Sequence, residues 1–278
     1  MSAEAKFKIS SWNIMHGINL TEPPTNGMPV IQSADLKAGC EQLAVDVLAV
    51  QEIDQYQQRS HQLDQAEFIS THAKLPNYRF IPTLLGNPDE GKKNWQAASE
   101  VEVDLANTNK SARYGIALFT RYPVRLWHQL DLVGAKVTTP IAIPGENGKP
   151  KLIWISDEPR AVLAAEVETE LGLVLIATTH LSFVPGRNIR QLRTALSWLS
   201  QFDLPKVFLG DLNLPARFIQ ALTSWQRTPV IPTFPITKPK VQFDHILTSS
   251  DLITTEVQAT KMPVGDHLML SASINRIK

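Results

Sequence analysis

Short apolar runs bounded by polar residues dominate the pattern of this chain. Val207–Leu209 is one such run, and its continuity is typical of a strand that is buried on both faces. Gly210, Asp211 and Asn213 follow it. If the chain stays extended, Asp211 and Asn213 point to the same side. An acid and an amide in such a place are costly to bury unless they bind something. The alternative is an Asp that caps a turn and an Asn in the following loop.

The same pattern predicts many strands and few helices. The clearest helix has apolar residues three or four apart, and two long strands joined by a tight turn at Leu171–Gly172 predict an antiparallel hairpin. We expect a helix-capping role for Ser33 or Asp35. Strands are predicted at Phe7–Asn13, Val47–Val50, Tyr78–Leu84, Tyr114–Thr120, Pro123–Leu132, Arg160–Glu168, Leu173–Leu181, Val207–Leu209, Val241–Leu247 and Leu268–Ile274, and helices at Ala34–Val45, Asp64–Lys74, Asn188–Leu199 and Ala216–Trp225.

Two stretches interrupt this pattern. Residues 86–112 are polar and mixed in charge, and residues 136–151 are rich in Pro and Gly. We interpret both as irregular surface insertions, because long loops in compact domains usually lie on the surface. Elsewhere strands dominate and helices separate only some of them. This order predicts two packed β-sheets flanked by helices, in one domain over residues 1–278, rather than a simple βαβ series.

Composition narrows the function classes. The 278 residues are 43% hydrophobic, which is enough for a large core, and 27 basic residues balance 27 acidic ones. No global positive field therefore attracts a polyanion. Cys40 is the only cysteine, which excludes an internal disulfide and a thiolate zinc cluster. The sequence shows no signal peptide and no apolar run long enough to span a bilayer, so we expect a cytoplasmic protein. We also expect it to be a monomer.

Polar residues gather at or near the ends of the predicted strands. Carboxylate and amide oxygens dominate the set, which suits a hard cation such as Mg2+ or Mn2+ rather than zinc. Carboxylates in one cleft would repel one another without a cation, and the imidazoles offer hydrogen bonds to phosphate oxygens. These features predict a phosphoesterase site. Its members are Asn13, Glu52, His180, Asp211, Asn213, Asp244, Asp266 and His267.

Six short motifs occur in an order that resembles the endonuclease/exonuclease/phosphatase superfamily. No single motif is specific, but six in this order over nearly the whole chain are hard to obtain by chance. The resemblance implies a four-layer α/β/β/α sandwich of two mainly antiparallel sheets, the DNase I-like fold, with the site along one edge. The motifs are WN (Trp12-Asn13), QE (Gln51-Glu52), THL (Thr179–Leu181), GDLN (Gly210–Asn213), FDHI (Phe243–Ile246) and GDH (Gly265–His267).

The resemblance also implies metal ligands. Glu52 would be the principal Mg2+ ligand, Asn13 would lie beside it, and Asp266 would complete the shell directly or through water. For Glu52, the alternative is a solvated carboxylate at a strand end.

The catalytic roles come from the same resemblance. Asp211 would orient or deprotonate the attacking water, and Asn213 would hold Asp211 or a phosphate oxygen. His267 would contact the scissile phosphate while Asp244 fixes its tautomer. His180 would donate to a non-bridging oxygen. Either Asp211 or His267 could be the general base, and we favour Asp211.

Three further residues are candidates for substrate binding. His16 fits the family's loop after the first strand, although a solvent-exposed loop histidine is the alternative. Tyr114 lies where some family nucleases have a phosphate-contacting tyrosine, and packing is its alternative. Arg160 could reach a substrate phosphate, although a surface ion pair also explains it. His245 alternates away from Asp244 and is expected to face the other side.

Together these features predict a metal-dependent hydrolase of phosphate esters. Because the chain is neutral overall, we favour a phosphomonoester or phosphodiester of a small molecule, lipid headgroup or nucleotide. A nuclease or DNA-repair phosphodiesterase acting on nucleic acid is the runner-up. A non-catalytic binding module on the same fold is a third alternative, and the complete set of site residues argues against it.

Overall fold

The computed structural model describes residues 5–22, 30–88, 92–100, 111–132, 138–144 and 150–277. Most of the strands in these ranges belong to two large sheets. The first sheet has the order β16-β17-β1-β4-β7-β5-β6, with bounds Leu252–Thr260, Met269–Arg276, Lys6–Asn13, Val47–Gln55, Arg113–Thr120, Asn77–Gly86 and Trp95–Ala97. The second has the order β14-β15-β13-β12-β11-β8, with bounds Gln226–Arg227, Asp244–Thr248, Lys206–Asp211, Gly172–His180, Arg160–Thr169 and Val124–Leu132.

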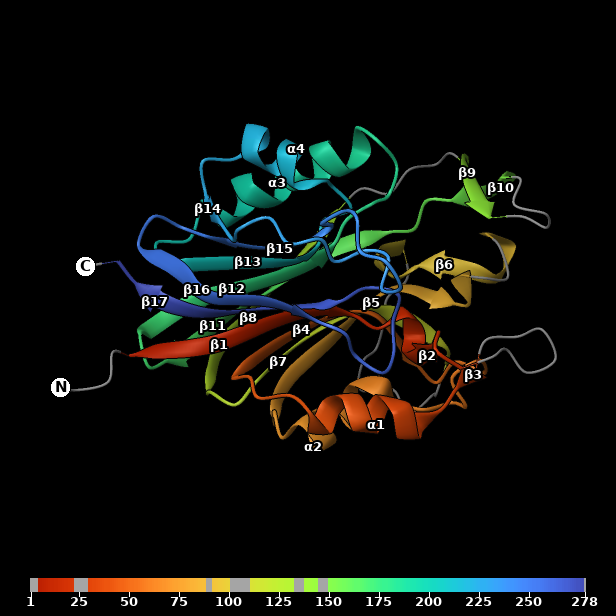
Figure 1. Ribbon diagram of the computed structural model, residues 1–278, viewed down its shortest axis with the longest axis horizontal. Helices are drawn as coiled ribbons and strands as arrows, with labels where there is room; N and C mark the ends of the chain where they lie inside the picture. Colours follow the sequence, from red (N-terminus) through yellow and green to blue (C-terminus); the bar gives the residue numbers. More distant parts are fainter. Residues whose placement is uncertain are drawn as a thin grey trace.

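The two sheets stack face to face between two layers of helices (Figure 1). Helices α1 (Ser33–Glu41) and α2 (Gln65–Ala73) cover the first sheet, and α3 (Arg187–Leu199) and α4 (Ala216–Leu222) cover the second. Neighbouring strands are antiparallel except β1 with β4 and β12 with β13. The predicted four-layer α/β/β/α sandwich is therefore confirmed.

Alternation along the strands explains why the apolar runs are continuous. On β1, Phe7 and Ile9 face the second sheet, whereas Trp12 packs with the helices of the first layer. On β13, Val207 faces the first sheet and Phe208 packs with the cluster around α3 and α4. Each central strand is buried on both faces, so apolar side chains occupy odd and even positions alike.

Several predicted elements are confirmed with shifted ends. The hairpin of β11 and β12 is antiparallel, as predicted. Asp64 caps α2 by accepting from the backbone N–H of Glu67, but α1 has Gln32 at its N-cap and no side-chain cap. The capping role expected for Ser33 or Asp35 was therefore wrong. The predicted helix beginning at Ala216 ends at Leu222 instead of Trp225.

The interpretation of residues 86–112 and 136–151 as irregular was partly wrong where the structure describes them; residues 89–91, 101–110, 136–137 and 145–149 lie outside the described part of the chain. In the first stretch, β6 pairs with the end of β5. In the second, β9 (Thr138–Pro144) pairs with β10 (Pro150–Ser156) as a separate two-stranded sheet. Another small pair joins β2 (Ile18–Asn19) and β3 (Val30–Ile31), and one-turn 3-10 helices lie at Met15–Gly17, Lys92–Asn94 and Ala98–Glu100. None of the helices in the described part of the chain has the length and apolar character needed to cross a bilayer.

Candidate active site

Three neighbouring strands of the second sheet place polar side chains in one row. His180 ends β12, Asp211 ends β13 and Asp244 begins β15. In the sheet register, His180 pairs with Asp211, and Asp211 pairs with Asp244. Because paired residues project to the same face of a sheet, the register brings three distant parts of the sequence together.

The first sheet contributes two residues opposite this row. Asn13 ends β1, as predicted. Glu52 was expected at the end of a strand, but β4 continues to Gln55. Glu52 instead occupies a β-bulge between Gln51 and Ile53, with a φ of 60°. A bulge re-aims the side chain of the extra residue, and this bulge turns Glu52 toward Asn13.

The loop before β17 contributes Asp266 and His267. It packs against the backbone of Asn13 at Gly265, where a Cβ atom would overlap the Asn13 carbonyl oxygen and where φ is +97°. Only glycine adopts this conformation without a steric cost. The loop is also tied by a hydrogen bond from the Leu268 N–H to the Thr233 carbonyl, so the position of His267 is fixed on both sides.

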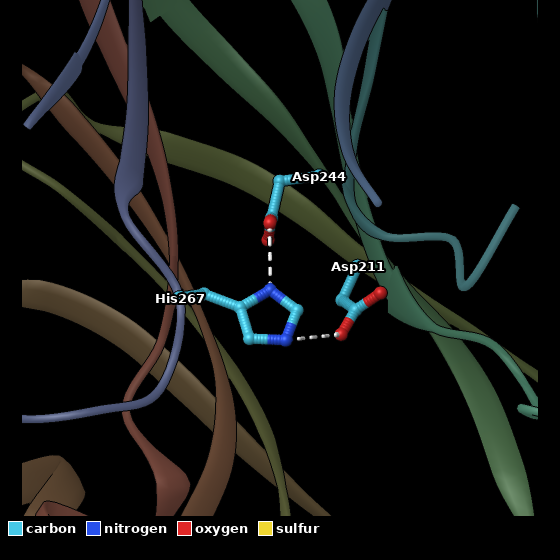
Figure 2. A group of neighbouring side chains, drawn as sticks. All are labelled: Asp211, Asp244 and His267. Atoms are coloured by element: carbon cyan, nitrogen blue, oxygen red, sulfur yellow. Dashed lines mark hydrogen bonds and ion pairs between the residues drawn. The ribbon is translucent and has the colours of Figure 1, made fainter. Parts of the chain in front are cut away.

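His267 lies between two carboxylates (Figure 2). Its Nδ1 is 2.8 Å from Asp244 Oδ2, and its Nε2 is 3.7 Å from Asp211 Oδ2. All three side chains are buried. Burial alone lowers the pKa of His267, but the charges of Asp244 and Asp211 and the hydrogen bond to Asp244 outweigh it and raise the pKa to about 10.

Asn13 links the two sheets at this point. Its Nδ2 donates to Glu52 Oε1 at 2.9 Å and to Asp211 Oδ2 at 3.2 Å, while its Oδ1 accepts from the Met15 N–H at 3.0 Å. One amide therefore holds a carboxylate from each sheet.

Crowding raises the pKa values of the carboxylates. For Glu52, burial and then the Asp266 carboxylate raise the pKa to about 7, although the hydrogen bond from Asn13 opposes this. Burial raises the pKa of Asp211 to about 6 against the opposing charge of His267. The pKa of Asp266 is also raised, chiefly by burial. Such a group of acids is costly at neutral pH unless positive charge is added.

His180 and Asn213 flank Asp211 in different ways. His180 Nε2 is 3.6 Å from Asp211 Oδ2, and burial together with the charge of Arg160 lowers its pKa well below the usual range. The expectation that Asn213 points the same way as Asp211 was wrong, because the strand ends and Asn213 has a φ of 48°. Its backbone N–H donates to Asp211 Oδ1, while its side-chain Nδ2 donates to the Leu181 carbonyl.

The three candidate substrate-binding residues are all buried. His16 is 8% exposed, so the alternative of a solvent-exposed loop histidine is wrong. Tyr114 lies under the guanidinium of Arg59, and burial, followed by the charge of Glu52, raises its pKa well above the usual value. Arg160 makes an ion pair with Glu158, but it is 5% exposed, so this is not the surface pair that the alternative assumed.

The sequence matches the Endonuclease/Exonuclease/phosphatase family over residues 10–267. The chain belongs to this family. No curated protein sequence matches it. Solved structures agree in fold with the family assignment. An endonuclease/exonuclease/phosphatase from Beutenbergia cavernae has a TM-score of 0.66 at 17% identity, covering 98% of this chain and 72% of that one.

Two further structural relatives have names that indicate a function. The catalytic domain of human nocturnin has a TM-score of 0.60 at 17% identity, covering 98% of this chain and 94% of that one. A mannosyl-6-phosphatase from Bacteroides thetaiotaomicron has a TM-score of 0.59 at 12% identity, covering 96% of this chain and 99% of that one. At these identities the likeness establishes the shared fold, and the activities belong to those proteins.

A divalent cation fits the donor set that this member of the family presents. Asp266 Oδ1 is buried and has no hydrogen-bond partner among the residues described, and Glu52 and Asp266 repel each other. Oxygen donors of this kind suit Mg2+ or Mn2+. A second group that could hold an ion is Asp211, Asp244 and His267, whose ligand atoms lie within 4.8 Å of one another.

Sequence reasoning missed two neighbours of the site. Glu158 lies two residues before Arg160, and only the fold shows that the two side chains pair. Phe234 packs its ring 4.8 Å from that of His267. No sequence pattern indicates a role for Phe234. Glu158 could have been found from the sequence, because an acid two residues before Arg160 is a candidate ion-pair partner. His245, as expected, turns away from Asp244 and contacts the Leu214 carbonyl.

Proposed function

We propose that the chain is a divalent-metal-dependent phosphoesterase that hydrolyses a phosphomonoester or phosphodiester of a small molecule, lipid headgroup or nucleotide by in-line attack of water. The observation that supports this most is the convergence of Glu52 and Asn13 with Asp211, Asp244 and His267 at one end of the space between the sheets. Carboxylates, an amide and an imidazole from the two sheets and their loops meet there, and burial makes the negative charge of the carboxylates unfavourable unless a cation is bound.

The metal would be held by Glu52 with Asn13 and Asp266. When bound, Mg2+ or Mn2+ supplies positive charge that offsets the phosphate and the crowded carboxylates. Both atoms of the Asn13 amide group already have partners, so we assign its oxygen a shared role between the Met15 N–H and the cation.

The assignment of Asp211 as the general base is supported by the two pKa values. Asp211 has a pKa of about 6, so it is mostly ionised at pH 7 to 8 and can accept a proton from water. His267 has a pKa of about 10 and is protonated in that range, so it has no basic nitrogen to offer. Protonated His267 would instead donate its Nε2–H to a phosphate oxygen.

The supporting residues orient these groups. Asp244 accepts from Nδ1 of His267 and keeps Nε2 directed toward Asp211. The backbone N–H of Asn213 holds the second oxygen of Asp211. His180 stays neutral because burial and Arg160 lower its pKa, so one ring nitrogen can donate to a non-bridging phosphate oxygen.

The decisive experiment is hydrolysis of a panel of phosphate esters with and without Mg2+ or Mn2+, together with Mn2+ binding measured by electron paramagnetic resonance. Activity should depend on the metal and vanish in EDTA, and Glu52→Gln should weaken Mn2+ binding. Lys37 and Glu41 form an exposed ion pair on α1, so Glu41→Gln is the matched control for the loss of one acid. Full activity in a metal-free preparation would refute the role of Glu52.

A further inference from the structure

Arg160 and Glu158 form a buried ion pair at the start of β11. Arg160 Nη2 is 3.3 Å from Glu158 Oε2, and the exposed fractions of the two side chains are 4% and 16%. Arg160 Nε is buried and has no hydrogen-bond partner among the residues described. Leaving a buried charged donor unsatisfied is costly, so this N–H is suited to donate a hydrogen bond to a ligand oxygen.

The pair lies beside the site. Val162 of β11 pairs with Thr179 of β12, so the start of β11 at Arg160 lies next to the end of β12 at His180. After burial, the charge of Arg160 is the main cause of the low pKa of His180. The charge of Glu158 contributes, after burial and Asp266, to the raised pKa of Glu52. The charges of Glu52, Glu158 and Arg160 all act on the pKa of Tyr114: the two carboxylates raise it and Arg160 lowers it. The pair therefore lies within electrostatic reach of both the proposed metal ligand and the proposed phosphate-binding imidazole.

We propose that Glu158 determines the substrate class of the phosphoesterase: it orients Arg160 toward the phosphate and adds a fixed negative charge that selects singly charged phosphodiesters over doubly charged phosphomonoesters. This inference rests on the proposed function and deepens it. The proposed function itself does not depend on Glu158 or on its ion pair with Arg160.

The charges of the site support the choice of a diester. Among the described residues, five acids face two cationic groups, Arg160 and protonated His267. If one divalent cation is bound, the net charge of the site is negative with Glu158 and zero without it. A monoester dianion therefore meets about twice the repulsion from Glu158 that a diester monoanion meets. The carboxylate is mostly buried, so water screens this repulsion only weakly. The acids are Glu52, Glu158, Asp211, Asp244 and Asp266.

The same carboxylate also has an orienting role. Burial lowers the pKa of Arg160, but Glu158 and smaller contributions from Tyr114, Asp157 and Glu52 raise it above the usual value, so the guanidinium stays charged. Pro159 separates the two residues and restricts the backbone between them. Glu158 thus fixes one edge of the guanidinium and leaves Nε for a phosphate oxygen.

Two substrates with one leaving group test the proposal. p-Nitrophenyl phosphate is a dianion and methyl p-nitrophenyl phosphate is a monoanion, so kcat/KM for the two compounds on one enzyme preparation isolates the charge of the ester. The wild-type enzyme should prefer the diester. Glu158→Gln keeps a hydrogen-bond acceptor for Arg160 but removes the charge, and should raise the monoester-to-diester ratio about 10-fold.

Two further variants separate charge from orientation. Glu158→Ala removes the acceptor as well, so it should also lower kcat for the diester, which Glu158→Gln should largely retain. Glu166 is the matched control, because it lies on β11, the strand that follows Glu158, and pairs with His128 and Arg125 away from the site. Glu166→Gln should leave the ratio unchanged.

The outcomes distinguish this inference from the proposed function. If the enzyme hydrolyses both compounds but Glu158→Gln leaves their ratio unchanged, or if the wild type prefers the monoester, the role of Glu158 is refuted and the phosphoesterase stands. If neither these compounds nor any ester of the panel is hydrolysed, the proposed function fails and the inference fails with it.

Discussion

The space between the two sheets has two ends of opposite character, although the same strands line both. Along the inner face of β1, Phe7 and Ile9 are followed by Ser11 and then Asn13. Strand β12 makes the same change, from Val174 and Ile176 to Thr178 and His180, and β13 passes from Val207 and Leu209 to Asp211. Within about four residues, β1 and β12 change from apolar to small polar side chains and then to Asn13 and His180, whereas β13 changes directly from Leu209 to Asp211.

A neutral polar layer separates the two ends. Ser11 Oγ donates to Gln51 Oε1 and Gln51 Nε2 donates to Thr178 Oγ1, both at 3.3 Å, so one buried glutamine connects the sheets. The oxygen and the nitrogen of the Gln51 side chain thus each have a hydrogen-bond partner that carries no charge. Burial of apolar area stabilises the fold at one end, at roughly 25 cal/mol per Å2. At the other end, burial of acids costs stability and shifts their pKa values. The fold thus places its chemistry where the stabilising core ends.

Asp211→Asn, a substitution at the polar end, should cause the largest loss of activity. The amide cannot accept a proton from water, so kcat should fall by about 10²- to 10⁴-fold. Because a buried negative charge disappears from a crowded group, the midpoint of urea unfolding without metal should not decrease. Steady-state kinetics and urea titrations of the same preparation measure both. A variant that unfolds at lower urea would instead show that Asp211 stabilises the fold.

Leu209→Ala changes the residue two positions earlier on the same face of β13. Leu209 is fully buried in the cluster between the sheets, and the cavity should lower the free energy of unfolding by about 2–5 kcal/mol. The kcat per folded molecule should stay close to that of the wild type, because no site residue is touched. A loss of kcat comparable to that of Asp211→Asn would show that the two ends are not separable.

A double-mutant cycle tests the pairing inside the polar end. Asp244→Asn removes the carboxylate that accepts from His267 Nδ1 and helps to keep the ring protonated, so it should lower kcat/KM by about 10- to 1000-fold, no more than His267→Ala does. The two changes together should be far from additive, because both remove one function. His180→Ala should combine additively with Asp244→Asn, since His180 contacts Asp211 rather than Asp244. Coupling of Asp244 to His180 instead would mean that acid and base are wrongly paired.

The pH dependence of stability should show the smallest effect. The native pKa values of Glu52, about 7, and Asp211, about 6, exceed the ordinary values of these carboxyl groups, 4.5 and 3.8. The native state therefore binds more protons than the unfolded state, and the metal-free protein should become more stable as pH falls from about 8 to about 5. His267 acts in the same direction, because its stabilising charge is fully present below about 6.5 and is lost as pH rises through about 10. His180 and His245 oppose this below about pH 6.5, because burial lowers their native pKa values and the unfolded state then binds the extra protons.

Urea unfolding in EDTA at pH 8.5 and 5.5 measures this slope. Glu52→Gln should flatten it, because one raised carboxyl pKa is removed. Over the same range Mn2+ affinity should fall as pH decreases, because protons compete for the ligands. A slope that Glu52→Gln leaves unchanged would contradict the raised pKa assigned to Glu52.

The pattern of side chains by itself determined the layers of this protein and predicted the residues of its candidate site. Continuous apolar runs are characteristic of strands buried on both faces, and the order of the six motifs named the family that the match over residues 10–267 shows. The hairpin of β11 and β12 and the clearest helix, α3, followed from local spacing. These features depend on near neighbours in the chain, so periodicity is enough to predict them.

Only the tertiary structure decided the directions in which the side chains of the site residues point. The bulge at Glu52 and the positive φ of Asn213 each depend on one backbone angle, which has no periodic signature. The paired strands β9 and β10 lie in a stretch whose Pro and Gly content predicts loops. Asn13 meets Asp211 from 198 positions away, and the charge that Glu158 adds near Glu52 exists only because two sheets are stacked. Such contacts are set by packing between sheets, and no local pattern encodes that geometry.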